Sequence, residues 1–396
     1  MIKREFYLNQ ILPYMKTDLI KIIVGIRRSG KSTLMKQIIE ILSQDGINKE
    51  EIIYLNFEDY QIRKYKDPDI LYDYLSHKIV DGKKTYIFLD EVQEVTNFEQ
   101  VVNSFHATKD VDIYLTGSNS KMLSGEYATL LTGRYKSFNI FPFSFKEMVT
   151  YHKNSDLKEL FKEFINHGGF PVIQGFETED QKRSILKDLY NSIVIRDIVQ
   201  RHNVSGVDAL DKYISYLLNT VGSQFSAKNI INYFKNEGRI ISKETLYNYI
   251  SYAQEVLLIY SAKRYDLKGK KLLTTNEKYF VNDQGLRATK FNNENDIEKI
   301  LENIVFFELL RRGYDVTVGK IADKEIDFIA TKNNKIEYYQ VTYIMEKAST
   351  REREFGSLNM IDDQYPKFVL SMDEIDFSQD GINHINIINF LLEIES

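Results

Sequence analysis

The chain contains no cysteine. Disulfide bonds and thiolate metal sites are therefore excluded, and the composition is compatible with a reducing cytoplasm. The sequence also lacks any uninterrupted run of about 18 apolar residues. At residues 1–16 it lacks the apolar core and small-residue cleavage site of a signal peptide. We therefore expect a cytoplasmic protein that is neither exported nor inserted in a membrane.

A strong excess of one charge is also missing, since the net charge is only −5 at pH 7. This balance argues against a chain coated in basic surface for nucleic acid. The charge is unevenly distributed, however: over residues 205–290, Lys and Arg number 13 and Asp and Glu number 8. That block is therefore locally basic, and it is where the composition favours a DNA contact.

Five short apolar runs alternate with helical stretches in the first part of the chain. They are rich in Ile, Val, Tyr and Phe, and they are nearly continuous in apolarity, as strands buried on both faces of a parallel sheet are. The runs cover residues 19–25, 51–58, 85–91, 111–118 and 134–141. The alternation predicts an α/β fold with a parallel sheet and crossover helices over residues 1–145.

The remaining sequence predicts three further parts. Residues 146–220 have a helical pattern, interrupted by a turn at the string HGGFP, and we expect a helical lid. Residues 221–292 predict helix, turn and helix, followed by two extended runs joined by the basic LKGKK, which is the order of a winged helix. Residues 293–396 predict a separate small α/β domain.

A glycine-rich string, GIRRSGKST, lies between the first apolar run and a predicted helix. It matches GxxxxGK[ST], the P-loop, in which backbone amides and a helix N-terminus surround a phosphate chain. Lys31 is expected to reach the β- and γ-phosphates, and the Ser32 hydroxyl to bind Mg²⁺. The predicted nucleotide-binding residues are Gly25, Ile26, Arg27, Arg28, Ser29, Gly30, Lys31, Ser32 and Thr33.

Two acidic residues end the third apolar run, TYIFLDE. Open α/β sheets bind ligands at the carboxyl ends of their strands, so both acids are expected beside the P-loop. Asp90 is predicted to orient the Mg²⁺ and its water shell, and Glu91 to polarise the attacking water. The alternative is that these acids only terminate a strand.

Polar and basic residues near the site are further candidates. Ser118 and Asn119 leave the adjacent run and are placed to sense the γ-phosphate, although turn formation alone would explain them. Arg134 is a candidate to stabilise transition-state charge in its own subunit or a neighbouring one, and the alternative is an ordinary surface or ion-pair arginine. Arg27 and Arg28 are expected either to clamp phosphate, to contact the lid, or to be solvated.

The nucleotide is expected to be ATP with Mg²⁺. A GTP-specific site calls for an NKxD-type segment, and the nearest string, NKEE at residues 48–51, lacks the aspartate and precedes a strand. No His-rich cluster suggests a separate transition-metal site. A monomer, a dimer and an AAA-type ring are all compatible with the sequence.

With these motifs in place, the chain resembles the prokaryotic AAA-type ATPases of the archaeal ATPase and STAND-like branch that carry a C-terminal domain of unknown function. The resemblance covers nearly the whole length. It is carried by GIRRSGKST, YLNFED, IFLDEVQEV, LTGSNSKML, the GR of LLTGRY, FPFSF and GGFP. It implies an ATPase core, a winged-helix segment and a terminal fold similar to PD-(D/E)XK nucleases.

The nuclease resemblance implies three acidic positions and a lysine. Glu302 matches the first position and Asp327 the second, but the third is Gln340 and the lysine position is Thr342. A neutral amide and a threonine cannot replace a carboxylate and an ammonium group in metal-assisted hydrolysis. We therefore expect a degenerate site, with a DNA-binding or protein-docking role favoured over cleavage.

Three functions follow from these motifs. The first is an ATP-driven switch whose C-terminal modules bind DNA or a protein partner. DNA would be contacted by a recognition helix at residues 243–256 and by Lys268, Lys270 and Lys271 in the wing. The second is an ATP-gated nuclease, and the third is a signalling or scaffold ATPase that binds no nucleic acid.

Overall fold

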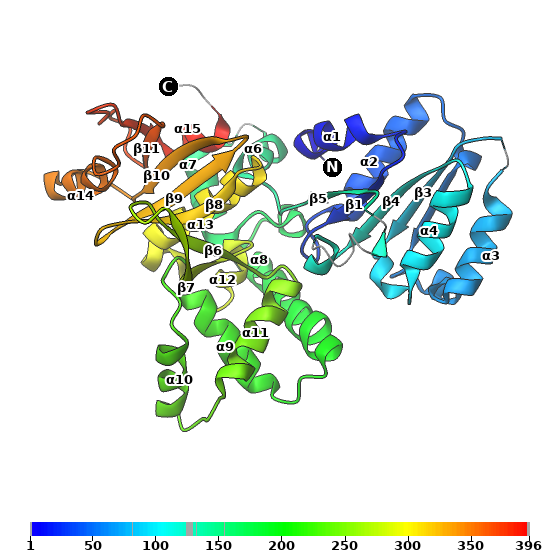
Figure 1. The fold of residues 1–396 in the computed structure, drawn as a ribbon, viewed down its shortest axis with the longest axis horizontal. Helices are drawn as coiled ribbons and strands as arrows, with labels where there is room; N and C mark the ends of the chain where they lie inside the picture. Colours follow the sequence, from blue (N-terminus) through cyan, green and yellow to red (C-terminus); the bar gives the residue numbers. More distant parts are fainter. Residues whose placement is uncertain (1, 81, 124–129, 132, 154, 394–396) are drawn as a thin grey trace. The chain divides into compact units, whose positions relative to one another are not determined.

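The structure is a computed structural model that describes residues 2–80, 82–123, 130–131, 133–153 and 155–393 (Figure 1). The chain forms two compact units. The N-terminal unit comprises Met1–Pro142 with Glu255–Leu257, and the C-terminal unit comprises Phe143–Gln254 with Leu258–Ser396. Among the described helices, none combines the length and apolarity needed to cross a membrane.

The N-terminal unit contains a five-stranded sheet of order β2-β3-β4-β1-β5 in which all pairings are parallel. The predicted α/β fold is confirmed, and each strand agrees within two residues with a predicted apolar run. The strands are β1 (Ile20–Val24), β2 (Ile52–Asn56), β3 (Thr85–Asp90), β4 (Val111–Gly117) and β5 (Tyr135–Asn139). Because β3, β4 and β1 are neighbours, their carboxyl ends lie along one edge of the sheet.

Helices pack on this sheet through apolar side chains. The main helices are α1 (Glu5–Ile11), α2 (Lys31–Gln44), α3 (Pro68–Lys78) and α4 (Phe98–Thr108). Helix α2 buries Leu34, Met35, Ile38 and Leu42, whose three- and four-residue spacing places them on one face. They share a core cluster with α1 and with Phe88 and Tyr114, two stacked rings of neighbouring strands. This packing fixes the start of α2 at the edge where β1 ends.

The C-terminal unit combines a seven-stranded mixed sheet, of order β12-β11-β10-β9-β8-β6-β7, with a group of helices. Its strands are β6 (Ile259–Asp266), β7 (Lys271–Val281), β8 (Asp315–Ile321), β9 (Lys324–Lys332), β10 (Lys335–Val341), β11 (Lys367–Ser371) and β12 (Asn383–Asn386). Its helices are α6 (Phe145–His152), α7 (Leu157–His167), α8 (Glu179–Ser192), a π-helix (Ile193–Gln200), α9 (Val207–Asn219), α10 (Ala227–Asn236), α11 (Lys243–Glu255), α12 (Gln284–Ala288), α13 (Ile297–Arg311), α14 (Ala348–Leu358) and α15 (Ile387–Leu392).

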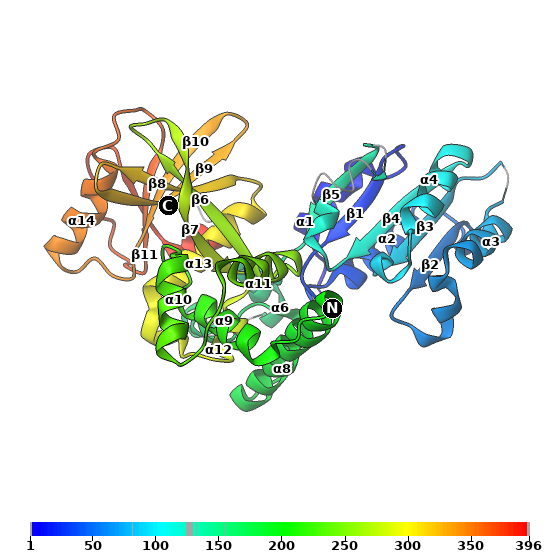
Figure 2. The ribbon, with the colours of Figure 1, turned by 60° about the horizontal axis from the view of Figure 1, so that its bottom comes forward.

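The hairpin predicted as the wing of a winged helix, β6 and β7, belongs to this large sheet (Figure 2). Strand β6 pairs in parallel with β8, with Arg264 opposite Val318, so its second edge is hydrogen-bonded instead of exposed. The predicted boundary at residue 292 therefore crosses one continuous sheet. Helices α10 and α11 do precede the hairpin in the predicted order, and a winged-helix function for them stays a prediction.

The HGGFP turn is joined to α12 by a buried carboxyl group. Asp283 Oδ2 accepts the Gly169 N–H at 2.7 Å, and Oδ1 accepts the Gly285 N–H at 2.8 Å. Gly169 has no room for a side chain, because a Cβ would lie 2.1 Å from the Phe143 carbonyl oxygen. Burial raises the pKa of Asp283 to about 7, although the two N–H groups and Arg311 favour its charged form.

This raised pKa predicts a pH-dependent stability. A carboxyl group with a folded pKa near 7 and an unfolded pKa near 3.8 stabilises the fold fully below the lower value, and this contribution is lost as pH rises through the upper one. We expect wild type to lose about 2–3 kcal/mol more unfolding free energy than Asp283→Asn between pH 5 and pH 8, since most of the two pKa units between pH 5 and pH 7 are crossed in this window. Urea unfolding at both pH values tests this, and parallel pH profiles of the two proteins would contradict it.

Candidate functional site

The predicted phosphate-binding loop connects β1 to α2. Gly30 has φ 103° and immediately precedes α2, a left-handed conformation that glycine adopts without strain. Gly25 is required for a different reason, because a Cβ there would lie 2.2 Å from the Ile140 carbonyl oxygen. The loop thus directs the free N–H groups at the start of α2 to the sheet edge, where they can bind an anion.

Lys31 lies at the centre of a buried polar cluster, with only 4% of its surface exposed. Its Nζ donates to the Gly25 carbonyl at 3.0 Å and to Ser118 Oγ at 3.0 Å, and it lies 3.3 Å from Glu91 Oε1. Ser118 in turn donates to Glu91, 3.0 Å from Oε2. Lys31, Ser118 and Glu91, which were predicted as site residues from three separate segments of the sequence, are therefore in direct contact.

Glu91 has a left-handed backbone, with φ 55°, which is unfavourable for a non-glycine residue by about 1–2 kcal/mol. This turn follows directly after β3 and directs the carboxylate to Lys31. Burial on its own would raise the pKa of Glu91, but Lys31, hydrogen bonds from Gln93 and Ser118, and Arg27 together lower it to about 2. The group is therefore an anion at neutral pH.

Asp90 is completely buried, and both of its oxygens accept hydrogen bonds. Thr116 donates to Oδ1, and the Tyr54 hydroxyl donates to Oδ2 at 2.8 Å. Thr116 Oγ1 also accepts the Glu91 N–H at 2.8 Å, so one β4 hydroxyl orients both acids. The sequence analysis did not single out Thr116, Tyr54 or Gln93. Only the pairing of β3 with β4 and with β2 could have pointed to Thr116 and Tyr54, which lie on those neighbouring strands.

The residues at this edge fit a Mg²⁺–nucleotide complex. Ser32, in the first turn of α2, and Asp90 offer only oxygen atoms, which Mg²⁺ prefers. Among the described residues no group of three or more His, Cys, Asp or Glu side chains forms a metal cage. Mg²⁺ sites commonly use one or two protein ligands and complete their shell with phosphate and water oxygens.

The remaining predicted residues of the N-terminal unit have different surroundings. Arg27 forms an ion pair with Glu58 at 2.9 Å, and Arg28 is exposed in the loop. Asn119 Oδ1 accepts the Lys121 N–H at 2.8 Å, a turn interaction, so Ser118 is the residue of this pair that contacts Lys31.

Arg134 is exposed at the amino end of β5, where the following residue pairs with Ile20 at the start of β1. The P-loop begins at the opposite end of β1, about 16 Å away for a five-residue strand. The structure thus contradicts a contribution of Arg134 to the phosphate site of its own chain. A contribution to the site of a neighbouring subunit stays a prediction.

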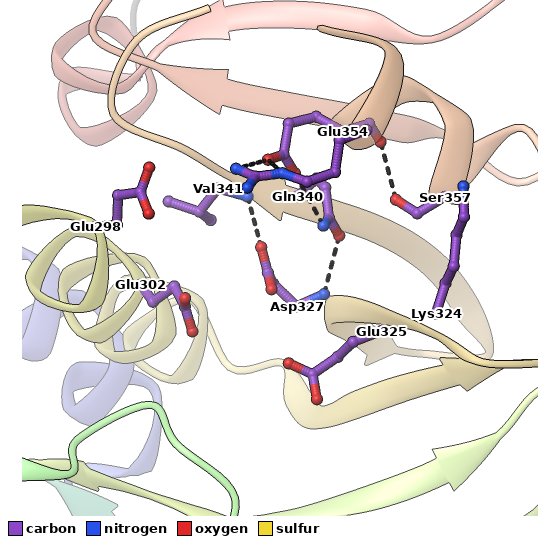
Figure 3. Close-up of a pocket in the computed structure, with 10 residues that line it drawn as sticks. Glu298, Glu302, Lys324, Glu325, Asp327, Gln340, Val341, Glu354 and Ser357 are labelled. Carbon is purple, nitrogen blue, oxygen red and sulfur yellow. Dashed lines mark hydrogen bonds and ion pairs between the residues drawn. The ribbon is translucent and has the colours of Figure 1, made fainter. Parts of the chain in front are cut away.

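The C-terminal unit contains a polar cavity of about 360 Å³ between α13, β9, β10 and α14 (Figure 3). It brings together Glu302, Asp327 and Gln340, the three residues of the predicted nuclease-like site. Further acids and two cations, Lys324 and Arg353, also line it. The acidic and amide side chains of the cavity are Glu298, Glu302, Glu325, Asp327, Gln340 and Glu354.

Hydrogen bonds within the protein occupy the central groups of this cavity. Gln340 Oε1 accepts the Asp327 N–H at 3.0 Å, and Gln340 Nε2 donates to Glu354 at 3.0 Å. Asp327 Oδ2 accepts the Val341 N–H at 2.8 Å. Burial, together with the nearby Glu302, raises the pKa of Asp327 well above its usual value and favours the neutral acid.

These groups do not fit the divalent metal that a nuclease-like site implies. Gln340 contributes an amide whose oxygen and nitrogen are both hydrogen-bonded, and Asp327 favours its proton. Thr342, in the lysine position, is buried, and its hydroxyl has no hydrogen-bond partner in the described part of the chain. The ammonium group that pairs with Glu302 comes instead from Lys278 on β7, which the sequence analysis missed because it assigned β7 to a different domain.

Comparison with known proteins adds two family models. A model described as an AAA domain matches residues 17–149, and a model described as a domain of unknown function (DUF8612) matches residues 158–296. The second match spans the predicted lid and the predicted winged helix together.

Relatives and solved structures also resemble this chain. An uncharacterized protein of Haemophilus influenzae is 39% identical over 99% of each chain. The uncharacterized protein MJ1544 of Methanocaldococcus jannaschii is 34% identical over 85% of this chain and 77% of the relative. The Walker-type ATPase PABY2304 of Pyrococcus abyssi matches with a TM-score of 0.50 at 14% identity, over 73% of this chain and 95% of that chain, which is a likeness of fold.

Proposed function

This chain belongs to the AAA-type P-loop ATPases, and we propose that it binds ATP with Mg²⁺ at Gly25–Thr33 and hydrolyses the bond between the β- and γ-phosphates. The observation that carries the proposal is the contact of Lys31, Ser118 and Glu91 beside the start of α2. A cation, a polar sensor and an anionic acid at one helix N-terminus are the parts that phosphoryl transfer to water requires.

Lys31 and the α2 amides neutralise the phosphates in this proposal. A γ-phosphate oxygen that accepts from Lys31 competes with Glu91 and Ser118, the partners that this lysine has in the structure. When Lys31 turns to phosphate, Glu91 loses its nearest cation, and its pKa rises toward values at which a carboxylate accepts a proton from water more readily. The Lys31–Glu91 pair thus links nucleotide binding to activation of the acid.

In this proposal Asp90 and Ser32 would hold the metal. Bound Mg²⁺ would supply charge neutralisation at the phosphate oxygens. Thr116 and Tyr54 keep the Asp90 carboxylate in place, which limits its side-chain freedom before any metal arrives. Ser118 is proposed to sense the γ-phosphate, since it contacts both Lys31 and Glu91.

The direct test combines two measurements on the full chain. Calorimetric titration with ATP and Mg²⁺ should show one binding site, and phosphate release should show steady-state turnover. The absence of nucleotide binding by the folded chain would overturn the whole proposal. Binding without turnover would overturn only hydrolysis.

For the C-terminal unit we propose a DNA contact at the turn between β6 and β7, with binding coupled to the ATP cycle. Lys268, Lys270 and Lys271 are all exposed at this turn, and they lie in the basic block of residues 205–290. Exposed ammonium groups bind DNA by displacing counterions from phosphates. The occupied hydrogen bonds of the C-terminal cavity do not support the alternative of an ATP-gated nuclease.

Replacing Lys268 and Lys270 by Gln is expected to weaken duplex DNA binding. The slope of log affinity against log salt concentration is negative, and each lost phosphate contact should make it less negative by about 0.9, or by nearly 2 for the pair. Lys335 and Lys347, two exposed lysines on the same unit, provide the control double variant. Fluorescence anisotropy at several salt concentrations tests this, and equal slopes for the two double variants would argue against the proposed surface.

A further inference from the structure

Lys278 is a buried ammonium group at the acidic cavity, with 4% of its surface exposed. Its Nζ lies 3.4 Å from Glu302 Oε2 on α13 and 2.5 Å from Glu325 Oε1 at the start of β9. Burial by itself would lower the pKa of Lys278, but the charges of Glu302, Asp327 and Glu325 raise it overall. Lys278 is therefore a buried cation paired with two carboxylates.

The segment before α10 also contacts these acids. Gln224 Nε2 donates to Glu325 Oε2 at 3.1 Å, and Gln224 also forms a backbone bridge with Lys278. Gly222, with φ 72°, passes so close that a Cβ would lie 3.2 Å from Glu302 Oε2. The carboxylates nearest Lys278 thus contact an ammonium group, an amide and a glycine backbone, all from this chain.

We propose that Lys278 is a resident cation of this cavity and occupies the place that a divalent metal would take beside Glu302 and Glu325. Replacing a mobile ion by a covalently attached ammonium group leaves the acids paired at all times. The cavity then does not catalyse metal-dependent cleavage. Its acids instead hold β7 and the segment before α10 against α13 and β9.

The proposal predicts that removing the lysine creates a metal site. Lys278→Met keeps most of the length of the side chain and removes the ammonium partner of Glu302 and Glu325, an arrangement that a divalent ion would stabilise. We expect this variant to bind Mn²⁺ at least about tenfold more tightly than wild type, and Mn²⁺ to raise its Tm but not that of wild type. Adding Glu302→Gln should abolish both gains.

The experiment uses the full chain without nucleotide, with Mn²⁺ binding measured by electron paramagnetic resonance and Tm by calorimetry. A Lys278→Met protein that folds but gains no Mn²⁺ site would overturn the proposal. If that variant does not fold, wild type and Glu302→Gln decide the question. Equal Mn²⁺ binding by these two supports the proposal, and loss of wild-type Mn²⁺ binding in Glu302→Gln overturns it.

Discussion

Glu91→Gln is expected to lower ATP turnover about a hundredfold or more while ATP binding is retained. Loss of a positioned general base typically costs between 10² and 10⁴ in rate. ATP affinity should not fall, because Lys31 then lacks its anionic partner at 3.3 Å and is freer to bind phosphate. Steady-state phosphate release and calorimetry with ATP and Mg²⁺ measure the two effects separately.

Two further variants make this result specific. Glu94→Gln changes an acid three residues away that pairs with Lys66, and it should retain turnover. Lys31→Ala should instead lose ATP binding, since it removes the cation that the phosphates need. A Glu91→Gln protein with wild-type turnover would show that another group activates the water.

Arg4→Ala is expected to destabilise the N-terminal unit by about 3 kcal/mol or more. The Arg4 side chain is 1% exposed; its Nη1 donates to the Ser29 carbonyl at 2.8 Å and its Nη2 to the Phe141 carbonyl at 3.0 Å. Its removal leaves a cavity and two buried carbonyls that lose charged donors, each worth about 1–3 kcal/mol. Urea unfolding of wild type and variant measures the difference.

Because Ser29 belongs to the P-loop, this variant should also weaken ATP binding. The Tyr7 hydroxyl accepts the Phe141 N–H at 3.2 Å, so Arg4 and Tyr7 together hold the end of the unit against the loop. Lys3→Ala is the control, since Lys3 is exposed. Equal unfolding free energies for the Arg4 and Lys3 variants would contradict a structural role for the buried guanidinium.

Local patterns were sufficient for much of the N-terminal unit. Strands buried on both faces need continuous apolar runs, and five such runs predicted the five strands of the sheet. The P-loop, Asp90, Glu91 and Ser118 were also predicted, because the carboxyl ends of neighbouring parallel strands meet at one edge. Arg134 was misplaced with respect to its own site: as the first residue of the run 134–141 it lies at the amino end of a parallel strand, and the P-loop lies at the carboxyl end of the neighbouring strand.

Contacts between distant segments were not predictable in the same way. Nothing in the sequence near Lys278 indicates that its ammonium group pairs with Glu302, on a segment assigned to another domain. Similarly, Arg4 has no local feature that marks it as buried below the P-loop. In both cases the partner is a carboxylate or carbonyl whose position depends on how the strands are ordered in the sheet.

The sequence by itself determined the α/β class, the phosphate-binding loop and the acids beside it, because strand periodicity and motif spacing act over short stretches of chain. Only the tertiary structure decided which cation neutralises the C-terminal acids and which hydroxyl orients Asp90. The physical reason is that charge pairing and burial depend on distances in space, and strand pairing brings together groups that are far apart along the chain.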